Sequence, residues 1–124
     1  MADDPSSKRD DPTVAGGAPV YKVQRRAHPL YLRQIKGPGA PRDVLLDIDE
    51  IVLGRAIEAQ ISIDSGAVSR RHAALLRSED RYTCVDLESS NGVFVNGQRV
   101  TSVELRDGDT VQVGDALFVF QEAR

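Results

Sequence analysis

Four short polar fragments interrupt the apolar runs of this 124-residue sequence and carry side chains able to do chemistry. They are Gly54-Arg55, Val68-Ser69-Arg70-Arg71-His72-Ala73, Asp86-Leu87-Glu88-Ser89-Ser90-Asn91-Gly92 and Asn96-Gly97. Arginine supplies a planar fork of donors that suits a phosphate oxyanion, and serine adds a short hydroxyl donor. The Asn91 amide offers a donor and an acceptor to a peptide main chain. These residue types predict a site that grips an anion and a neighbouring stretch of backbone.

Each of these side chains also has a simpler interpretation. Arg55 can form a surface ion pair with a carboxylate such as Glu58 or Asp64, which is the commonest fate of an exposed arginine. Ser69 and Ser90 can be turn residues that bond their own backbone. Taken one at a time, these structural interpretations are the simpler ones, so the prediction of a site depends on all the fragments meeting.

A hydrolase is the first competing function, because Ser69, His72 and Asp86 are the residue types of a catalytic triad. Ser69 and His72 are only three residues apart, and the sequence contains no Gly-x-Ser-x-Gly elbow and no run of oxyanion-hole glycines. We therefore expect no enzyme, and we expect His72 to be a buried structural residue bonded to loop backbone.

Short strands must position these fragments, because apolar runs with a period of two recur along the chain. We expect strands at residues 30–35, 44–48, 51–53, 61–63, 73–76, 82–87, 93–95, 111–113 and 117–120. Turn residues separate them, and no interval after residue 50 has a helical pattern. The sequence predicts an all-β, antiparallel sandwich, whose end loops can bring distant fragments together.

Asn96-Gly97 is the strongest local signal of a turn. A two-residue type I′ hairpin needs positive φ at both central positions, which asparagine tolerates and glycine adopts freely. We expect this pair to connect two strands without touching a ligand. Asp107-Gly108 is expected to form the same kind of turn.

Composition and charge exclude several classes of protein. With 16 Lys and Arg against 19 Asp and Glu, the net charge of −3 argues against a general nucleic-acid binder. No apolar run approaches the roughly 20 residues that cross a bilayer, and the polar start lacks the core of a secretory signal. The lone Cys84, with two histidines, predicts no disulfide, metal site or cofactor, and the simplest compartment is a reducing cytoplasm.

Residues 1–20 differ in composition from the rest of the chain. They contain two Asp pairs, a Gly pair, three single Pro residues and no aromatic residue. This composition predicts a flexible acidic tail. Residues 21–124 form the predicted single domain, which is long enough to bury its own core. The basic stretch from Lys22 to Arg26 fits an edge strand, a partner contact or a linker equally well. Arg outnumbers Lys 13 to 3, which indicates a GC-rich, bacterial genome.

The order of these fragments resembles the forkhead-associated (FHA) domain family. The shared pattern is Gly-Arg, then Ser-x-x-His, Ser-Asn-Gly and Asn-Gly, then a final Gly-Asp and Val-Gly at residues 108–109 and 113–114. The likeness covers roughly residues 30 to 122. It implies a sandwich of about eleven strands that binds phosphothreonine peptides through loops at one end and is not an enzyme.

The resemblance also implies roles for single residues. Arg55, Ser69 and Ser90 would contact the phosphate, Arg70 would flank it, and Asn91 would hold the peptide main chain. Five other residues would shape the loops: Gly54, His72, Gly92, Asn96 and Gly97.

The implied partner is a threonine-phosphorylated protein, either a kinase or its substrate. Some family members carry a basic residue two positions before the motif serine, where this chain has Ala67. We therefore expect fewer basic side chains around the phosphate and a lower affinity for the phosphopeptide. The second competing function is a scaffold of the same fold that binds partners without phosphate. The presence of both Arg55 and Ser69 discriminates against it.

Thr13 carries a separate hypothesis about regulation. It lies in the Asp-flanked segment that precedes the domain, where a kinase can reach it. Some bacterial relatives capture their own phosphorylated tail, so phosphorylated Thr13 would compete for the site at high effective concentration. The alternative is an inert, solubilising leader.

Overall fold

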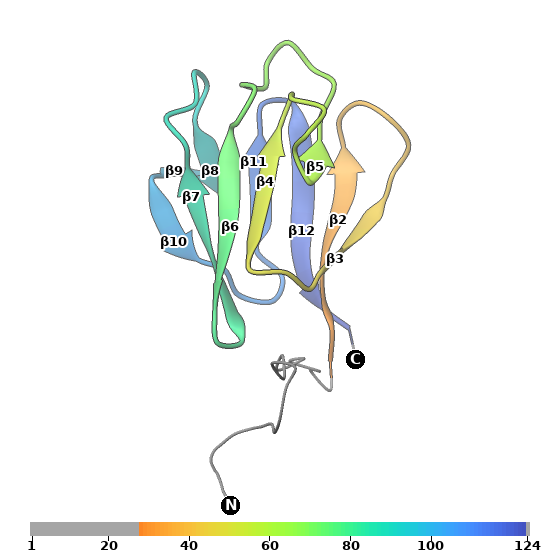
Figure 1. Cartoon of the computed structure of the whole chain (residues 1–124), viewed down its shortest axis with the longest axis vertical. Coiled ribbons are helices and arrows are strands. Elements are labelled where there is room, and N and C mark those ends of the chain that lie inside the picture. Colours follow the sequence, from red (N-terminus) through yellow and green to blue (C-terminus); the bar gives the residue numbers. More distant parts are fainter. Residues whose placement is uncertain (1–27, 124) are drawn as a thin grey trace, which may run out of the picture.

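The computed structural model describes residues 28–123, which form strands and turns without a helix. The tail of residues 1–20, Thr13 and the stretch from Lys22 to Arg26 lie outside the described residues. Eleven strands follow one another (Figure 1): β2 (Leu30–Lys36), β3 (Asp43–Leu46), β4 (Glu50–Gly54), β5 (Ile61–Ser62), β6 (Ala73–Ser78), β7 (Arg81–Asp86), β8 (Val93–Val95), β9 (Gln98–Val100), β10 (Ser102–Glu104), β11 (Thr110–Val113) and β12 (Ala116–Glu122). No helix in the described part of the chain has the length and hydrophobicity to cross a membrane.

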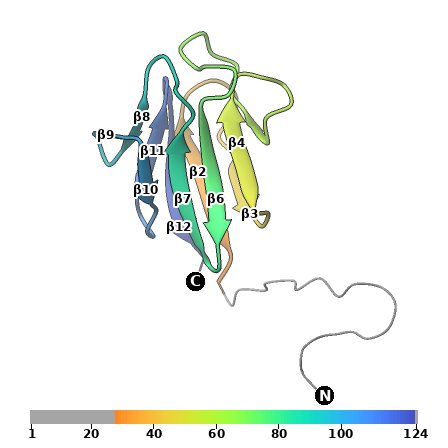
Figure 2. The same cartoon turned by 60° about the vertical axis from the view of Figure 1, so that its left-hand side comes forward.

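The strands form two sheets packed face to face, as the sequence predicts. One sheet has the order β10-β7-β6-β4-β5 and the other β3-β2-β12-β11-β8-β9. Pairing is antiparallel throughout with one exception, the short parallel pair β4–β5, in which Leu53 lies opposite Ile61. Figure 2, turned from the view of Figure 1, shows the two layers with β4, β6 and β7 in front of β2 and β12.

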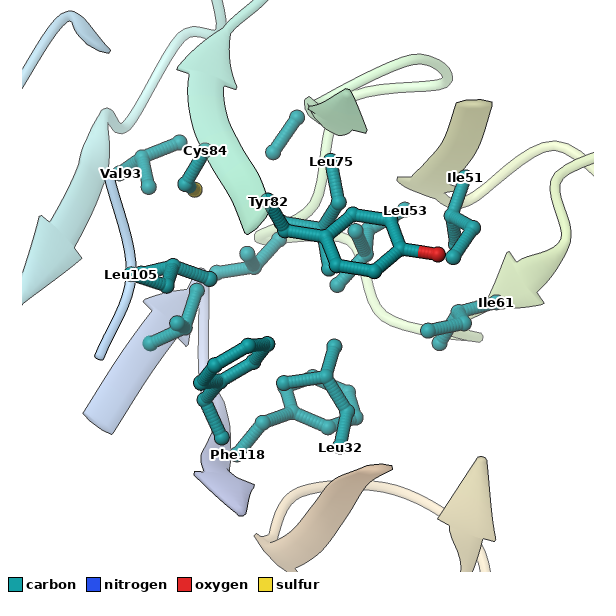
Figure 3. Close-up of a cluster of buried hydrophobic side chains, with 14 of the residues drawn as sticks. Leu32, Ile51, Leu53, Ile61, Leu75, Tyr82, Cys84, Val93, Leu105 and Phe118 are labelled. Carbon is teal, nitrogen blue, oxygen red and sulfur yellow. The ribbon is translucent and has the colours of Figure 1, made fainter. Parts of the chain in front are cut away.

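Alternation along the strands builds the core between the sheets. In β2, Leu32 is fully buried while Arg33 faces solvent, and in β12, Phe118 is fully buried between half-buried neighbours. Tyr82 lies in the middle of the cluster (Figure 3), with its hydroxyl donating to the carbonyl oxygen of Ile48 at 2.7 Å. Burial of one such large side chain contributes about 1.5–3 kcal/mol, so this cluster supplies the main stabilisation of the domain.

Two of the expected elements differ from the structure. The predicted strand at residues 44–48 ends at Leu46, because the chain turns back toward β4 at residues 47–49. Asp107-Gly108 is not a type I′ hairpin turn: Gly108 alone has positive φ, and the segment connects β10 in one sheet with β11 in the other. That prediction was wrong because the dipeptide signal carries no information about which strands it joins.

The buried Gln34 forms a polar pair with the half-buried Arg42. Gln34 is only 2% exposed, and its amide oxygen accepts a 2.8 Å hydrogen bond from Arg42 Nε. The same guanidinium donates through Nη2 to the carbonyl oxygen of Ser62 at 2.7 Å. This bridge ties the β2–β3 loop to β5 and so fixes the point at which the β5–β6 loop begins.

Three connections gather at the end of the sandwich drawn uppermost in Figure 1: the β4–β5, β5–β6 and β7–β8 loops. They contain three of the four polar fragments described above. The fold thus brings together residues from 55 to 92 that are distant in sequence.

Candidate functional site

Gly54 places the β4–β5 loop directly against the β5–β6 loop. A Cβ atom on Gly54 would clash with the carbonyl oxygen of Arg70. The backbone N–H of Arg55 donates to the Ser69 carbonyl at 2.9 Å, and that of Ala56 donates to the Arg70 carbonyl at 3.1 Å. Glycine is needed here for this close approach of two backbones.

Arg55 projects from this junction to the surface. Its Nε donates a 3.0 Å hydrogen bond to the Val68 carbonyl oxygen, which fixes the root of the guanidinium beside Ser69. Within residues 28–123 it forms no ion pair, so the alternative pairing with Glu58 or Asp64 is not made. The remaining guanidinium N–H donors are therefore available to an anion.

Ser69 and Ser90 meet across two loops. The hydroxyl oxygen of Ser69 accepts a 3.1 Å hydrogen bond from the backbone N–H of Ser90, which leaves the hydroxyl proton of Ser69 free to be donated. Ser90 is exposed. The structure therefore brings Arg55, Ser69 and Ser90 to one place, as the sequence analysis required.

His72 holds this arrangement from beneath. It is fully buried, its Nδ1 accepts from the Ser69 backbone N–H at 3.0 Å, and its Nε2 donates to the Gly92 carbonyl at 2.8 Å. Because one nitrogen must accept and the other donate, this network assigns the neutral tautomer with its proton on Nε2. Both ring nitrogens are occupied by backbone, and neither bonds the Ser69 hydroxyl, so the geometry is not that of a hydrolase triad.

The β7–β8 loop is closed by its own side chains. Asp86 accepts from the Ser89 backbone N–H at 2.9 Å, and the Ser89 hydroxyl accepts from Gly92 N at 2.9 Å. Ser89 is 9% exposed; in the sequence it belongs to the polar fragment 86–92, but no role was assigned to it. Glu88 has a φ of 58°, a left-handed conformation that costs a non-glycine residue about 1 kcal/mol. The loop is therefore held in a defined and slightly strained shape.

Asn91 reaches from this loop to the opposite one. Its Nδ2 donates to the Ala67 carbonyl oxygen at 2.7 Å, while its Oδ1 has no hydrogen bond within the described residues. The β11–β12 turn supports the same loop, because a Cβ on Gly114 would lie 2.7 Å from Val68 Cγ2. The Asn91 acceptor thus faces outward from a fixed side chain.

Arg70 and Arg71 lie on the other side of Ser69 and are exposed. They line an open depression of about 230 Å³ whose other walls are Val52, Ala56, Glu58, Ala59 and Gln60. In the residues the structure describes, neither arginine forms an ion pair. Arg55, Arg70 and Arg71 together give this end of the molecule a local positive charge on a chain whose net charge is negative.

Asn96 and Gly97 do not join the cluster. They form the predicted turn between β8 and β9, with φ values of 53° and 82°, and β8 separates them from Gly92. Asn96 Oδ1 accepts from the Thr110 backbone N–H, and Nδ2 donates to Asp109 Oδ1, each at 2.9 Å. The turn therefore fixes the start of β11 and not the loops of the site.

A metal site is not formed by the described residues. No three His, Cys, Asp or Glu side chains among residues 28–123 lie close enough to hold a metal ion. The available chemistry is that of a cation and hydrogen-bond donors on a rigid loop frame, which suits binding of an oxyanion.

Comparison with known proteins adds to this geometry. The family model of the FHA domain matches residues 51–114. The chain is 40% identical over 112 residues to the oxoglutarate dehydrogenase inhibitor of Corynebacterium diphtheriae, covering 90% of this chain and 71% of the relative. It is 39% identical over 85 residues to the glycogen accumulation regulator GarA of Mycobacterium tuberculosis, covering 68% of this chain and 52% of GarA.

Solved structures show the same fold. The Mycobacterium tuberculosis EmbR protein, in complex with a low-affinity phosphopeptide, superimposes with a TM-score of 0.71 and 36% identity over 77% of this chain and 25% of EmbR. The chain thus spans 71% of the length of the Corynebacterium diphtheriae relative and about half the length of GarA. The match to the family model and the similarity in sequence and fold establish that this chain belongs to the FHA domain family.

Proposed function

We propose that this chain is a phosphothreonine-dependent binding module that recognises protein partners in Ser/Thr kinase signalling. The observation that carries the proposal is the junction of three loop residues: Arg55 Nε bonds the Val68 carbonyl beside Ser69, and the Ser69 hydroxyl bonds the backbone N–H of Ser90. A phosphorylated threonine carries about −1.5 to −2 charges and three acceptor oxygens. One fixed cation and two hydroxyl donors complement this group, while Asn91 Oδ1 is placed to accept from the adjacent peptide N–H.

Binding without phosphate is the competing function. A scaffold that recognises only an unmodified surface has no need of an unpaired arginine above two convergent serines. Support for the phosphate-dependent function comes from the absence of any carboxylate partner for Arg55 within residues 28–123. A cation left without a partner at a loop junction is available to an anionic ligand.

The relatives support a regulatory role exerted by binding and not by catalysis. One is an inhibitor of oxoglutarate dehydrogenase and another a regulator of glycogen accumulation. We infer that this chain, too, acts on a protein partner in the cytoplasm and has no catalytic activity of its own. Its phosphorylated partner is either a kinase or a kinase substrate.

The test is calorimetric titration with a phosphothreonine peptide selected from an oriented library, alongside the unphosphorylated and phosphoserine forms. A charge-assisted hydrogen bond contributes roughly 1.5–3 kcal/mol, so Arg55→Ala is expected to weaken binding about tenfold or more. Arg106→Ala removes the same charge from an exposed loop after β10 and serves as the control. Equal affinity for phosphorylated and unphosphorylated peptide, or wild-type affinity in Arg55→Ala, contradicts the proposal.

Thr13 extends the same proposal to regulation. We propose that phosphorylated Thr13, which lies outside the described residues, binds the site of its own chain and competes with external ligand. The support is its place in an Asp-flanked segment preceding the domain. Protein phosphorylated at Thr13 is expected to bind an external phosphopeptide more weakly than Thr13→Ala treated with the same kinase. An unchanged affinity excludes this regulation.

A further inference from the structure

Arg99 lies beside the β7–β8 loop although it belongs to another element. In β9 it pairs with Phe94 of β8, so its side chain is on the same face as Phe94 and diagonal to Gly92. A Cβ on Gly92 would lie 2.7 Å from Arg99 Nε and 2.9 Å from Cζ. The guanidinium thus occupies the space left by the missing side chain and rests against the loop that holds Asn91.

The charge of Arg99 is not neutralised by its surroundings. The residue is exposed and makes no side-chain hydrogen bond or ion pair with any residue from 28 to 123. Other strand arginines differ: Arg33 pairs with Asp43 at 2.9 Å, Arg77 with Asp49 at 2.6 Å and Arg81 with Glu104 at 3.1 Å. Among the strand arginines of the described residues, Arg99 therefore differs in being a cation without a carboxylate partner.

Arg99 lies against a loop that hydrogen bonds connect to the proposed phosphate-binding residues. Gly92 accepts from His72, whose other ring nitrogen holds Ser69, and the preceding Asn91 bonds Ala67. To reach Arg99, a peptide bound at Ser69 and Ser90 would have to leave the phosphothreonine along the β7–β8 loop. Since an extended peptide advances about 3.3 Å per residue, only residues near the phosphothreonine could do so. A guanidinium at that point matches the geometry of a side-chain carboxylate.

We propose that Arg99 is a specificity-determining residue, which selects phosphothreonine ligands carrying Asp or Glu within a few residues of the phosphothreonine. This inference rests on the proposed phosphopeptide binding and adds the kind of sequence that the site selects. Arg55 supplies affinity for the phosphate, and Arg99 discriminates among phosphorylated sequences. The exposed position sets the expected effect at about twofold to fivefold, in the range of a surface ion pair.

The experiment uses the full chain and a set of phosphothreonine peptides that differ at one position. A single Glu is moved through the flanking positions, and each peptide has a partner with Gln at the same place. Wild-type protein is expected to prefer Glu to Gln by about twofold to fivefold at a restricted set of positions, and added salt should reduce this preference. Arg99→Gln is expected to abolish the preference, measured as the ratio of the affinities for the Glu and Gln peptides.

Two variants separate charge from structural effects. Arg99→Lys keeps the cation and is expected to keep most of the preference, and Arg106→Gln makes the same charge change elsewhere and should keep all of it. The proposal is overturned if wild-type protein binds Glu and Gln peptides equally at every position, or if Arg99→Gln retains the preference. In that case Arg55→Ala still loses phosphopeptide binding, whereas failure of the wild type to bind any phosphothreonine peptide overturns the proposed function itself.

Discussion

Gly54 and His72 organise the end of the sandwich that carries the proposed binding site, without needing to touch a ligand. Gly54 allows the β4 terminus and the Arg70 carbonyl to approach, and His72 joins Ser69 to Gly92 through its two ring nitrogens. Both residues act on backbone, so they fix the places from which Arg55 and Ser69 project. The donors are thereby oriented before a ligand arrives, which reduces the entropy lost on binding.

Replacement of Gly54 tests this view. Gly54→Ala is expected to destabilise the domain by about 1–3 kcal/mol, because the added methyl group forces the Arg70 carbonyl away. It should also weaken phosphopeptide binding, since Arg55 and Ser69 lie on the two displaced segments. Denaturant unfolding and calorimetric titration measure the two effects.

Gly66→Ala is the matched control, in the β5–β6 loop itself. No atom lies within 4 Å of a Cβ at Gly66, so stability and affinity should stay near those of the wild type. Equal behaviour of the two alanine variants contradicts a structural requirement for glycine at residue 54.

The residue types of the site were readable from the sequence, but not all of their contacts were. Arg55, Ser69 and Ser90 have side chains whose chemistry is typical of phosphate binding. Arg99 has the same chemistry and was passed over, because its importance depends on the β8–β9 register and on the missing side chain of Gly92. Cross-strand placement of this kind is not encoded by local spacing.

At the scale of the elements, the Asn96-Gly97 turn does more than reverse the chain. Besides adopting positive φ, Asn96 bonds the backbone of Thr110 and the carboxylate of Asp109. It therefore attaches the β8–β9 hairpin to the start of β11, at a distance from the binding loops. The turn was predicted from its dipeptide, whereas these two long-range bonds were not, because asparagine was considered only for its backbone preference.

Asn96→Ala is expected to cost about 2–3 kcal/mol of folding free energy, through two lost hydrogen bonds and a less tolerated left-handed conformation. The folded fraction should bind phosphopeptide with unchanged affinity, because β8 lies between the turn and the site. Unfolding curves and titration below the transition check the two statements. A fall in affinity as large as the fall in stability contradicts a purely structural turn.

The strands themselves were predictable where burial alternates and poorly predictable where it does not. Central strands such as β2 and β12 have the period-two pattern that the core demands. The edge strands β9 and β10 have three residues each and no fully buried side chain. β9 was expected only because a strand must follow the Asn96-Gly97 turn, and β10 was not expected, since nothing in its composition separates it from a loop. The parallel β4–β5 pair was not expected either, because it joins only two residues of each strand.

For the whole molecule, the packed core determines how stability depends on pH. Burial raises the pKa of the Cys84 thiol to about 12, with a smaller contribution from Asp86, compared with an ordinary value of 9.0. Burial also raises the pKa of Tyr82. Both groups lose their protons more readily in the unfolded chain than in the folded one, so alkaline pH favours unfolding.

The free energy of unfolding is therefore expected to be nearly constant just below pH 9 and to fall as pH rises toward 12. Cys84→Ala is expected to be less stable at neutral pH because it leaves a small cavity, but to show a shallower alkaline decline. Tyr82 remains in that variant and accounts for the residual slope. Denaturant unfolding across this range measures both, and an identical slope in the two proteins contradicts the role of the thiol.

The ends of the described chain lie far from the binding loops. The backbone N–H of Ala123 donates to the carbonyl of Pro29 at 2.8 Å, so both ends leave the sandwich together, at the lower end in Figures 1 and 2. A second body tethered at either end would leave the ligand-binding surface unobstructed. Attachment at either end therefore leaves the proposed binding loops facing away from the attached body.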